Sequence, residues 1–373
     1  MRRALAADSV TGLYALALGA ASVMLTFIAL DERLDLATIS LLSAASAASQ
    51  FVSRIFIGPL YRVLSDRLVM AGALALLLGS MLVVATVPSL TGLAIAQVLQ
   101  GISRSAFWSA AQLHVLRISA EPARGMGRNQ FIANSLGALG PVIAGVLAGH
   151  DPRTAAWVAG GVAALGALGC AALASLPTLP RVVRTSDNRI WQHRGLRIAA
   201  FGSLAGGCFN SVVITFAPVV LHDAGWSEPR VGAVVGVANA GLVAGALLSG
   251  RVPANLFSRA VTTATVATAT GIALLSLTQP VPVAAIAGMI ASGIGTGVIL
   301  TLAPTLASAS VPDQQSGGAV VFAGVFRAGA LLGTPLLVSL ATLALPTAGA
   351  MLIVGLLAAA PASWTAARRH RQF

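Results

Sequence analysis

The strongest constraint on the fold is a series of twelve apolar segments, each long enough to cross a lipid bilayer as a helix. A helix rises about 1.5 Å per residue, so roughly 20 apolar residues span the hydrocarbon core. The short alternating segments of a transmembrane barrel are not visible. The sequence therefore predicts an all-α membrane protein with twelve transmembrane helices. They cover about residues 9–30, 37–58, 68–87, 90–117, 128–149, 154–176, 197–221, 229–250, 260–278, 281–307, 316–341 and 345–366.

The composition is typical of a chain whose solvent is lipid. Of 373 residues, 57% are hydrophobic and only 9% are charged. All 23 basic residues are arginine, which with abundant Ala and Gly favours a bacterial genome rich in G and C. The net charge of +12 is scattered between apolar segments, so we expect no nucleic-acid partner. Cys170 and Cys208 lie inside apolar segments and predict neither a disulfide nor a metal site.

The arginines predict the orientation in the membrane. The basic lead Met1–Asp8 enters an apolar run of at least twenty residues with no cleavage signal, which favours a retained first span. With the N-terminus inside, seventeen arginines fall on the cytoplasmic side, and the opposite loops hold only Arg33, Arg153 and Arg230. We therefore expect a multi-pass protein of the bacterial inner (plasma) membrane with both termini in the cytoplasm.

The second half of the chain repeats the first. Three residue pairs lie 192 positions apart: Gly58 and Gly250, Arg67 and Arg259, Gly101 and Gly293. Gly140 and Gly333 lie 193 apart. A register held over five spans indicates duplication, which predicts two pseudo-symmetric six-helix bundles. The predicted organisation is a bundle at 1–176, a cytoplasmic linker at 177–195 and a second bundle at 196–373.

Three short motifs resemble those of major facilitator superfamily transporters. The loop Arg62-Val-Leu-Ser-Asp66-Arg67 is similar to the family's G-x-L-x-D-R loop, with Arg62 in place of Gly and Val69 in place of a second Gly. Gln97-Val-Leu-Gln-Gly101 is similar to R-x-x-Q-G, with Gln97 in place of Arg. Gly137-Ala-Leu-Gly140-Pro141 resembles a motif frequent in the family's exporters. The resemblance implies alternating access around a central cavity.

The resemblance also implies roles for two of these motifs. Asp66 and Arg67 are candidate gating residues, with Asp66 expected to face the start of the 316–341 span, where free N–H groups favour negative charge. A solvated loop acid is the alternative for Asp66. For Gly140 and Pro141 we favour a packing role, in which helices approach and bend.

The implied cavity is lined mainly by the first, fourth, seventh and tenth spans. Polar residues at helical spacing there and in the neighbouring spans are the candidates for substrate binding. They are Arg104, Arg327, Trp108, Gln97, Gln100, Gln130, Asn134, Asn210, Tyr14 and Thr296.

Arg104 and Arg327 are the most informative candidates. Each lies near the middle of an apolar span with no carboxylate at the same depth, where a charge costs several kcal/mol. In the repeat, Asn134 stands at the position of Arg327 and Thr296 at that of Arg104. A guanidinium suits a carboxylate or phosphate, and Trp108 lies one turn from Arg104, where it suits an aromatic solute. The alternative is that backbone carbonyls or neighbouring amides satisfy both arginines.

Two further polar residues are interpreted as structural. Arg54 lies one turn from the cytoplasmic end of its span and is expected to extend to the interface. His114 is expected to be an interface histidine rather than a proton relay.

These patterns favour a transporter of a small organic solute, with an anion suggested by the two arginines. The alternative is an exporter of drugs or metabolites. No cluster of His, Asp or Glu lies at one depth, so we predict no enzyme activity, no metal and no cofactor. The expected partners are a small-molecule substrate and the lipid bilayer, and the chain is expected to be a monomer.

Overall fold

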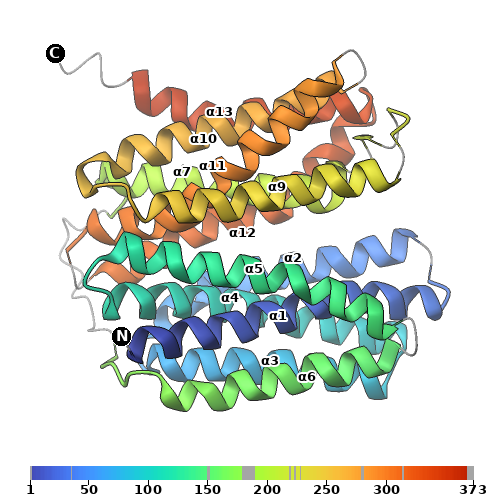
Figure 1. The fold of residues 1–373 in the computed structure, drawn as a ribbon, viewed down its shortest axis with the longest axis vertical. Coiled ribbons are helices and arrows are strands. Elements are labelled where there is room, and N and C mark those ends of the chain that lie inside the picture. The colour runs from blue at the N-terminus through green and yellow to red at the C-terminus, as the bar shows by residue number, and fades with distance from the viewer. Residues whose placement is uncertain are drawn as a thin grey trace. The chain divides into compact units, whose positions relative to one another are not determined.

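A computed structural model describes residues 2–34, 36–148, 152–178, 190–217, 220–221, 224–226, 228–278, 281–312 and 315–367. Within these ranges the chain is helical, with no strand (Figure 1). The twelve α-helices described correspond one to one to the twelve predicted spans. They are α1 (Arg2–Asp31), α2 (Leu36–Leu60), α3 (Asp66–Thr86), α4 (Leu90–Ile118), α5 (Pro122–Ala148), α6 (Pro152–Gly169), α7 (Arg194–Ser211), α9 (Glu228–Ser249), α10 (Phe257–Leu274), α11 (Pro282–Ala309), α12 (Ser316–Ala341) and α13 (Thr347–Ala367). Helices α1 and α5 begin six or seven residues earlier, and α6 and α7 end seven to ten residues earlier, than predicted.

Local sequence signals explain where several helices begin. The Ser65 and Ser89 hydroxyls accept hydrogen bonds from Leu68 N–H and Gly92 N–H at the starts of α3 and α4. Such caps satisfy backbone donors that a helix leaves unpaired. Helices α5, α6 and α11 begin at a proline, whose missing N–H is tolerated in a first turn. One feature was not predicted: α7 continues into a π-helical turn, η3 (Val212–Phe216).

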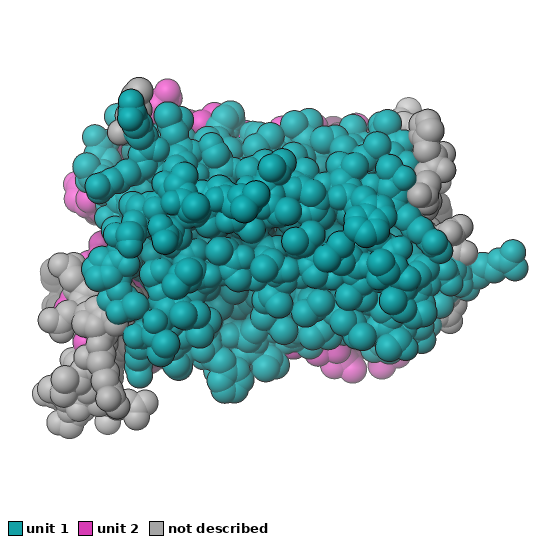
Figure 2. Space-filling view, turned by 90° about the horizontal axis from the view of Figure 1, so that it is seen from below, with its two compact units in different colours: residues 1–182 teal, residues 183–373 magenta. Residues whose placement is uncertain are grey.

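The chain forms two compact units, unit 1 (Met1–Val182) and unit 2 (Val183–Phe373), coloured separately in Figure 2. The predicted linker at 177–195 falls largely on residues 179–189, which lie outside the described ranges. Its boundaries therefore stay a prediction.

Each unit packs its helices in the same pattern. In unit 1, α1 packs on α5 and α6, α4 packs on α2 and α3, and α3 also packs on α6. In unit 2, α7 packs on α12 and α13, α11 packs on α9 and α10, and α10 also packs on α13. The helix pairs correspond one to one along the chain, as a duplication requires.

The repeat extends to single contacts. A Cβ on Gly101 in α4 would clash with the Ser46 carbonyl oxygen in α2, and a Cβ on Gly293 in α11 would clash with the Ala238 carbonyl oxygen in α9. Ser46 and Ala238 are themselves 192 residues apart, so both halves use one crossing. Small residues let backbones approach closely where lipid supplies no hydrophobic drive between helices.

The α1–α5 crossing confirms the packing role predicted for Gly140. A Cβ there would lie 2.5 Å from Ala20 N and from Leu16 O. Its repeat partner Gly333 in α12 has no such neighbour within 4 Å. The duplicated glycine therefore serves a close contact in only one half.

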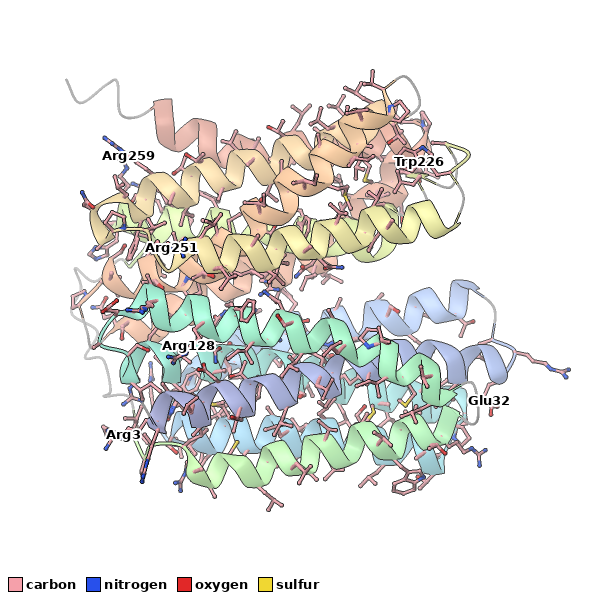
Figure 3. All side chains as sticks on the ribbon, in the orientation of Figure 1. Arg3, Glu32, Arg128, Trp226, Arg251 and Arg259 are labelled. Carbon is pink, nitrogen blue, oxygen red and sulfur yellow. The ribbon has the colours of Figure 1, made fainter. Side chains whose placement is uncertain are left out.

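Helix length and composition are those of a membrane protein. Within the described residues, seven helical stretches are long and apolar enough to cross a bilayer: Arg2–Ala21, Leu41–Leu60, Asp66–Thr86, Arg153–Ala172, Ala254–Leu277, Pro282–Ala309 and Ser316–Ala341. Two shorter apolar stretches are Ala233–Ser249 and Ala348–Ala360. Figure 3 shows Arg3 and Arg128 at one end of unit 1 and Glu32 at the other.

Each unit buries one free cysteine. Cys170 follows α6 in a 3-10 turn, η1 (Cys170–Ala172), and is 2% exposed; Cys208 in α7 is 7% exposed. Both are small buried apolar residues, as predicted.

Candidate functional site

The polar face of α4 in unit 1 holds the main candidate site. Gln97, Arg104 and Trp108 are partly exposed, whereas Gln100 is fully buried. Their spacing of three and four residues places them on one side of the helix. This face therefore presents a cation and an indole next to each other.

Arg104 has a hydrogen-bond partner among the described residues at Nη2 but not at Nε. Its Nη2 donates to Gln100 Oε1 at 3.3 Å, and Gln100 Nε2 donates to Ser80 Oγ in α3 at 3.3 Å. The Nε atom of Arg104 is buried and has no hydrogen-bond partner among the described residues. No described carboxylate forms an ion pair with Arg104 either. Burying such a donor without a partner costs roughly 1–3 kcal/mol, so the site favours an added acceptor.

Three aromatic rings stand beside this arginine. Tyr14 of α1 stacks on Phe107 with centroids 3.6 Å apart and planes at 5°, and both side chains are buried. Trp108 meets both rings edge to face, at 5.7 and 5.8 Å. The Tyr14 hydroxyl lies 3.2 Å from Ser103 Oγ, which donates to the Ala73 carbonyl. Tyr14 and Gln100 were both predicted to bind substrate. In the structure Tyr14 packs against Trp108, and Gln100 accepts a hydrogen bond from Arg104.

Helix α5 supplies two amides with a donor to spare. Gln130 is 2% exposed, and Asn134 one turn later is partly exposed. Gln130 Nε2 and Asn134 Nδ2 are buried without a partner among the described residues. Arg104 Nε, Gln130 Nε2 and Asn134 Nδ2 are all hydrogen-bond donors.

Arg54 corrects the interpretation made from the sequence. Instead of extending to the membrane interface, it is 3% exposed, and its Nε donates to Ser109 Oγ in α4 at 3.3 Å. Spacing within α2 cannot reveal a partner 55 positions away on another helix.

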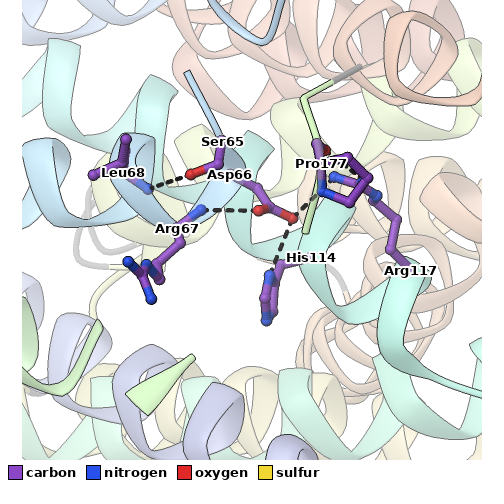
Figure 4. A network of polar contacts seen from close by, with 7 residues as sticks. All are labelled: Ser65, Asp66, Arg67, Leu68, His114, Arg117 and Pro177. Atoms are coloured by element: carbon purple, nitrogen blue, oxygen red, sulfur yellow. Dashed lines mark hydrogen bonds and ion pairs between the residues drawn. The ribbon is translucent and has the colours of Figure 1, made fainter. Parts of the chain in front are cut away.

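The gating candidate Asp66 is buried rather than solvated. It is 1% exposed, and its carboxylate accepts hydrogen bonds from Arg67 N at 2.9 Å and Arg117 Nη1 at 3.4 Å (Figure 4). His114 Nδ1 lies 3.0 Å from Asp66 Oδ2. Arg117 also donates through Nη2 to the Pro177 carbonyl at 2.7 Å. All of these partners belong to unit 1, and the predicted contact with the start of 316–341 stays a prediction.

His114 lies in the same network. Its ring is fully buried beside Asp66, and its Nε2 has no partner among the described residues, while its place at the membrane interface stays a prediction. Tyr61, in the loop before Asp66, is also buried. This burial raises the pKa of its hydroxyl above the ordinary value, so Tyr61 stays neutral beside the Asp66 carboxylate.

Asp8 is a second buried carboxylate. The sequence analysis placed it at the mouth of the first span. In the structure α1 starts at Arg2, so Asp8 lies in its second turn and is 3% exposed. Arg128 Nε donates to Asp8 Oδ2 at 2.6 Å, and Asn129 Nδ2 donates to Asp8 Oδ1 and to Thr11 Oγ1, each at 3.1 Å. This network ties α1 to α5 and leaves Asp8 occupied.

The candidates in unit 2 are less concentrated. Arg327 in α12 is partly exposed, and a Cβ on Gly207 in α7 would lie 2.5 Å from its carbonyl oxygen. Asn210, at the end of α7, is also partly exposed. Thr296 is fully buried, with its hydroxyl 3.4 Å from Thr268 Oγ1 in α10, so it joins two helices.

Unit 2 also contains an aromatic cluster that the sequence analysis missed. Trp191, in the 3-10 turn η2 (Ile190–Gln192), stacks on Phe326 with centroids 5.7 Å apart and contacts Phe201 and Phe322. Trp191 lies within the predicted linker at 177–195, and it fastens the chain before α7 to α12.

The comparisons with known proteins decide the family. A family model described as Major Facilitator Superfamily matches residues 9–252. The chain belongs to this superfamily. The fold agrees: the human organic anion transporter MFSD10 (TETRAN) superposes with a TM-score of 0.79 at 15% identity, covering 98% of this chain and 99% of that one. The search of curated proteins finds no match. This superfamily member is a multi-pass membrane protein of the transporter class, and its described residues contain no group of three His, Cys, Asp or Glu suited to a metal.

Proposed function

We propose that this superfamily member carries a small organic anion across the membrane by alternating access, with Arg104 as its main anion-binding residue. The observation that carries the proposal is the buried, unpartnered Nε of Arg104, next to no described carboxylate. A guanidinium with a free donor binds carboxylate or phosphate in preference to a cation. Gln130 and Asn134 add further donors and no negative charge.

Two other observations support an anion. Asp8 and Asp66, the buried acids of unit 1, are engaged by Arg128 and by His114 and Arg117. Neither is available to attract a cationic solute. The MFSD10 protein, which shares the fold, is itself an organic anion transporter.

The test is uptake into proteoliposomes by the purified protein, with radiolabelled anionic and neutral organic solutes. We expect Arg104→Gln to lower anion uptake at least tenfold, since a hydrogen bond to a charged group contributes about 1.5–3 kcal/mol. Uptake of neutral solutes should change little. Arg62→Gln, which removes an exposed loop charge, is the matched control.

Arg327→Gln is the second variant, because Arg327 is the other arginine near the middle of an apolar span with no carboxylate at the same depth. We propose that Arg327 also binds the transported anion. If anion uptake survives both Arg104→Gln and Arg327→Gln, the anion proposal is wrong.

Export of drugs or metabolites is the second candidate. It is favoured by the close α1–α5 packing at Gly140, within the motif that resembles the family's exporters. A strain lacking the gene should become more sensitive to at least one member of a panel of toxic organic compounds. Unchanged sensitivity to the whole panel would count against export.

We propose cytoplasmic termini in a bacterial inner membrane, on the strength of the arginine distribution. Arg251 and Arg259 lie at one end of unit 2 and Trp226 at the other, as the predicted orientation requires (Figure 3). Reporter fusions at the C-terminus that are active only in the cytoplasm test this orientation.

A further inference from the structure

Trp108 and Arg104 form one composite surface on α4. They are one turn apart, which corresponds to a rise of about 6 Å. Helical side chains lean toward the N-terminus, so the Trp108 indole leans over the turn that carries Arg104. Both side chains are partly exposed, although their neighbours Ser103, Ser105, Phe107 and Ser109 are buried.

The indole is held in a fixed orientation. Its plane stands at 88° to the Tyr14 ring and at 87° to the Phe107 ring. Those two rings are stacked and fully buried, and the Tyr14 hydroxyl is fixed by Ser103. A rigid aromatic surface binds a flat ring at a low cost in conformational entropy.

The cation beside the indole is equally fixed. Gln100, itself held by Ser80, anchors one end of the guanidinium through Nη2. The buried Nε has no partner among the described residues, and it belongs to the turn below the indole. A ligand of this surface would therefore supply a hydrogen-bond acceptor for the guanidinium and an apolar face for the indole.

We infer that the solute is an aromatic carboxylate, whose carboxylate binds Arg104 while its ring lies against Trp108. This inference rests on the proposed function and narrows its substrate class. The spacing of about one helical turn suits a carboxylate joined to the ring directly or through one or two methylenes. An aliphatic anion would satisfy Arg104 and leave the aromatic surface unused, whereas a cation would be repelled by Arg104.

The experiment measures binding of two probes of equal charge and similar size, phenylacetate and cyclohexylacetate, to the purified full chain by calorimetry. We expect phenylacetate to bind about three- to tenfold more tightly, the range of aromatic pair contributions. Trp108→Leu should remove this preference by weakening phenylacetate alone. Trp108→Phe, which keeps an aromatic ring, should retain most of it.

Trp157→Leu is the matched control, because Trp157 in α6 is 53% exposed and is not part of the surface. It should leave both affinities unchanged. Equal binding of the two probes by the unmodified protein, or an equal loss of both in Trp108→Leu and Trp108→Phe, would overturn the inference.

Arg104→Gln separates this inference from the proposed function. If this variant loses both probes but the unmodified protein does not prefer phenylacetate, the anion site stands and the aromatic preference is wrong. If the unmodified protein binds neither probe, or if Arg104→Gln binds both unchanged, then both proposals are wrong.

Discussion

The two halves share one packing frame but differ in what they bury. In the described residues of unit 1, the buried polar side chains include Asp8, Arg54, Asp66 and His114, whereas those of unit 2 are Ser and Thr residues and Gln315. Many of the unit 2 hydroxyls bond carbonyls of their own helix, as Thr301 does to Gly297 and Thr305 to Thr301. Duplication has therefore kept the helix crossings while charge was concentrated in the first half.

The difference can be followed position by position. Ser258, Leu306 and Ala309 stand 192 residues after Asp66, His114 and Arg117. Likewise Ala246 and Thr301 stand at the positions of Arg54 and Ser109. A buried charge needs partners on other helices, so it arises only where several positions change together. This asymmetry is what the following substitutions test.

The largest effect should come from Asp66→Asn. Losing this carboxylate leaves the Arg117 charge and the His114 ring without their acceptor, at a cost of about 3–5 kcal/mol in the free energy of unfolding. Ser258→Ala, at the corresponding position of unit 2, should cost less than about 0.5 kcal/mol. Denaturant unfolding in detergent measures both. Similar losses would show that the halves are not specialised in this way.

Substitution of the glycine at the shared helix crossing should lower stability equally in both halves. Gly101→Val and Gly293→Val each place a branched side chain against a backbone carbonyl, so each should cost about 1–3 kcal/mol. Gly236→Val in α9 is the control, because nothing lies within 4 Å of its Cβ position. The yield of monodisperse protein and its melting temperature report the result. If the protein tolerates valine at only one of the two positions, the two helix crossings are not equivalent.

A smaller difference in stability between the halves is expected at the duplicated glycine, Gly140 in unit 1 and Gly333 in unit 2. Gly140→Ala pushes α1 from α5 and should cost about 1–2 kcal/mol, whereas Gly333→Ala has room and gains helix propensity. Melting temperatures of the two alanine variants measured side by side test this difference. A matched destabilisation of both would contradict the contact geometry.

The smallest effect should come from Ser109→Ala. It removes the hydroxyl that accepts from Arg54 Nε, and side-chain hydrogen bonds within membrane proteins contribute on average about 0.6 kcal/mol. Thr301→Ala removes only a bond within its own helix and should be closer to neutral. A double-mutant cycle of Arg54→Met with Ser109→Ala isolates the pair. A coupling energy of zero would show that the contact stabilises nothing.

The sequence predicted the fold well, because hydropathy and the arginine distribution act on whole segments. Each predicted span corresponds to one described helix, with ends that differ by up to ten residues, and the repeat appears as equivalent crossings at Gly101 and Gly293. Both signals are local or periodic. Neither needs knowledge of which helices touch.

The polar contacts between helices could not be predicted from the sequence. Arg54 and Ser109 are 55 positions apart, and Asp66 and His114 are 48 apart, so no spacing rule joins them. Spacing within α1 likewise could not show that the Tyr14 ring is buried against Trp108, and the role of Tyr14 in substrate binding stays a prediction. The π-turn η3 (Val212–Phe216), which holds four apolar residues and Thr215, was also not predicted from composition.

The two hidden thiols give each half its own reporter. Cys170 and Cys208 are shielded in separate units, and the chain has no other cysteine or any lysine. A thiol-reactive reagent therefore labels one residue when the first half opens and the other when the second half opens. Timing the two modifications by mass spectrometry orders the local unfolding of the halves in a single unmodified protein.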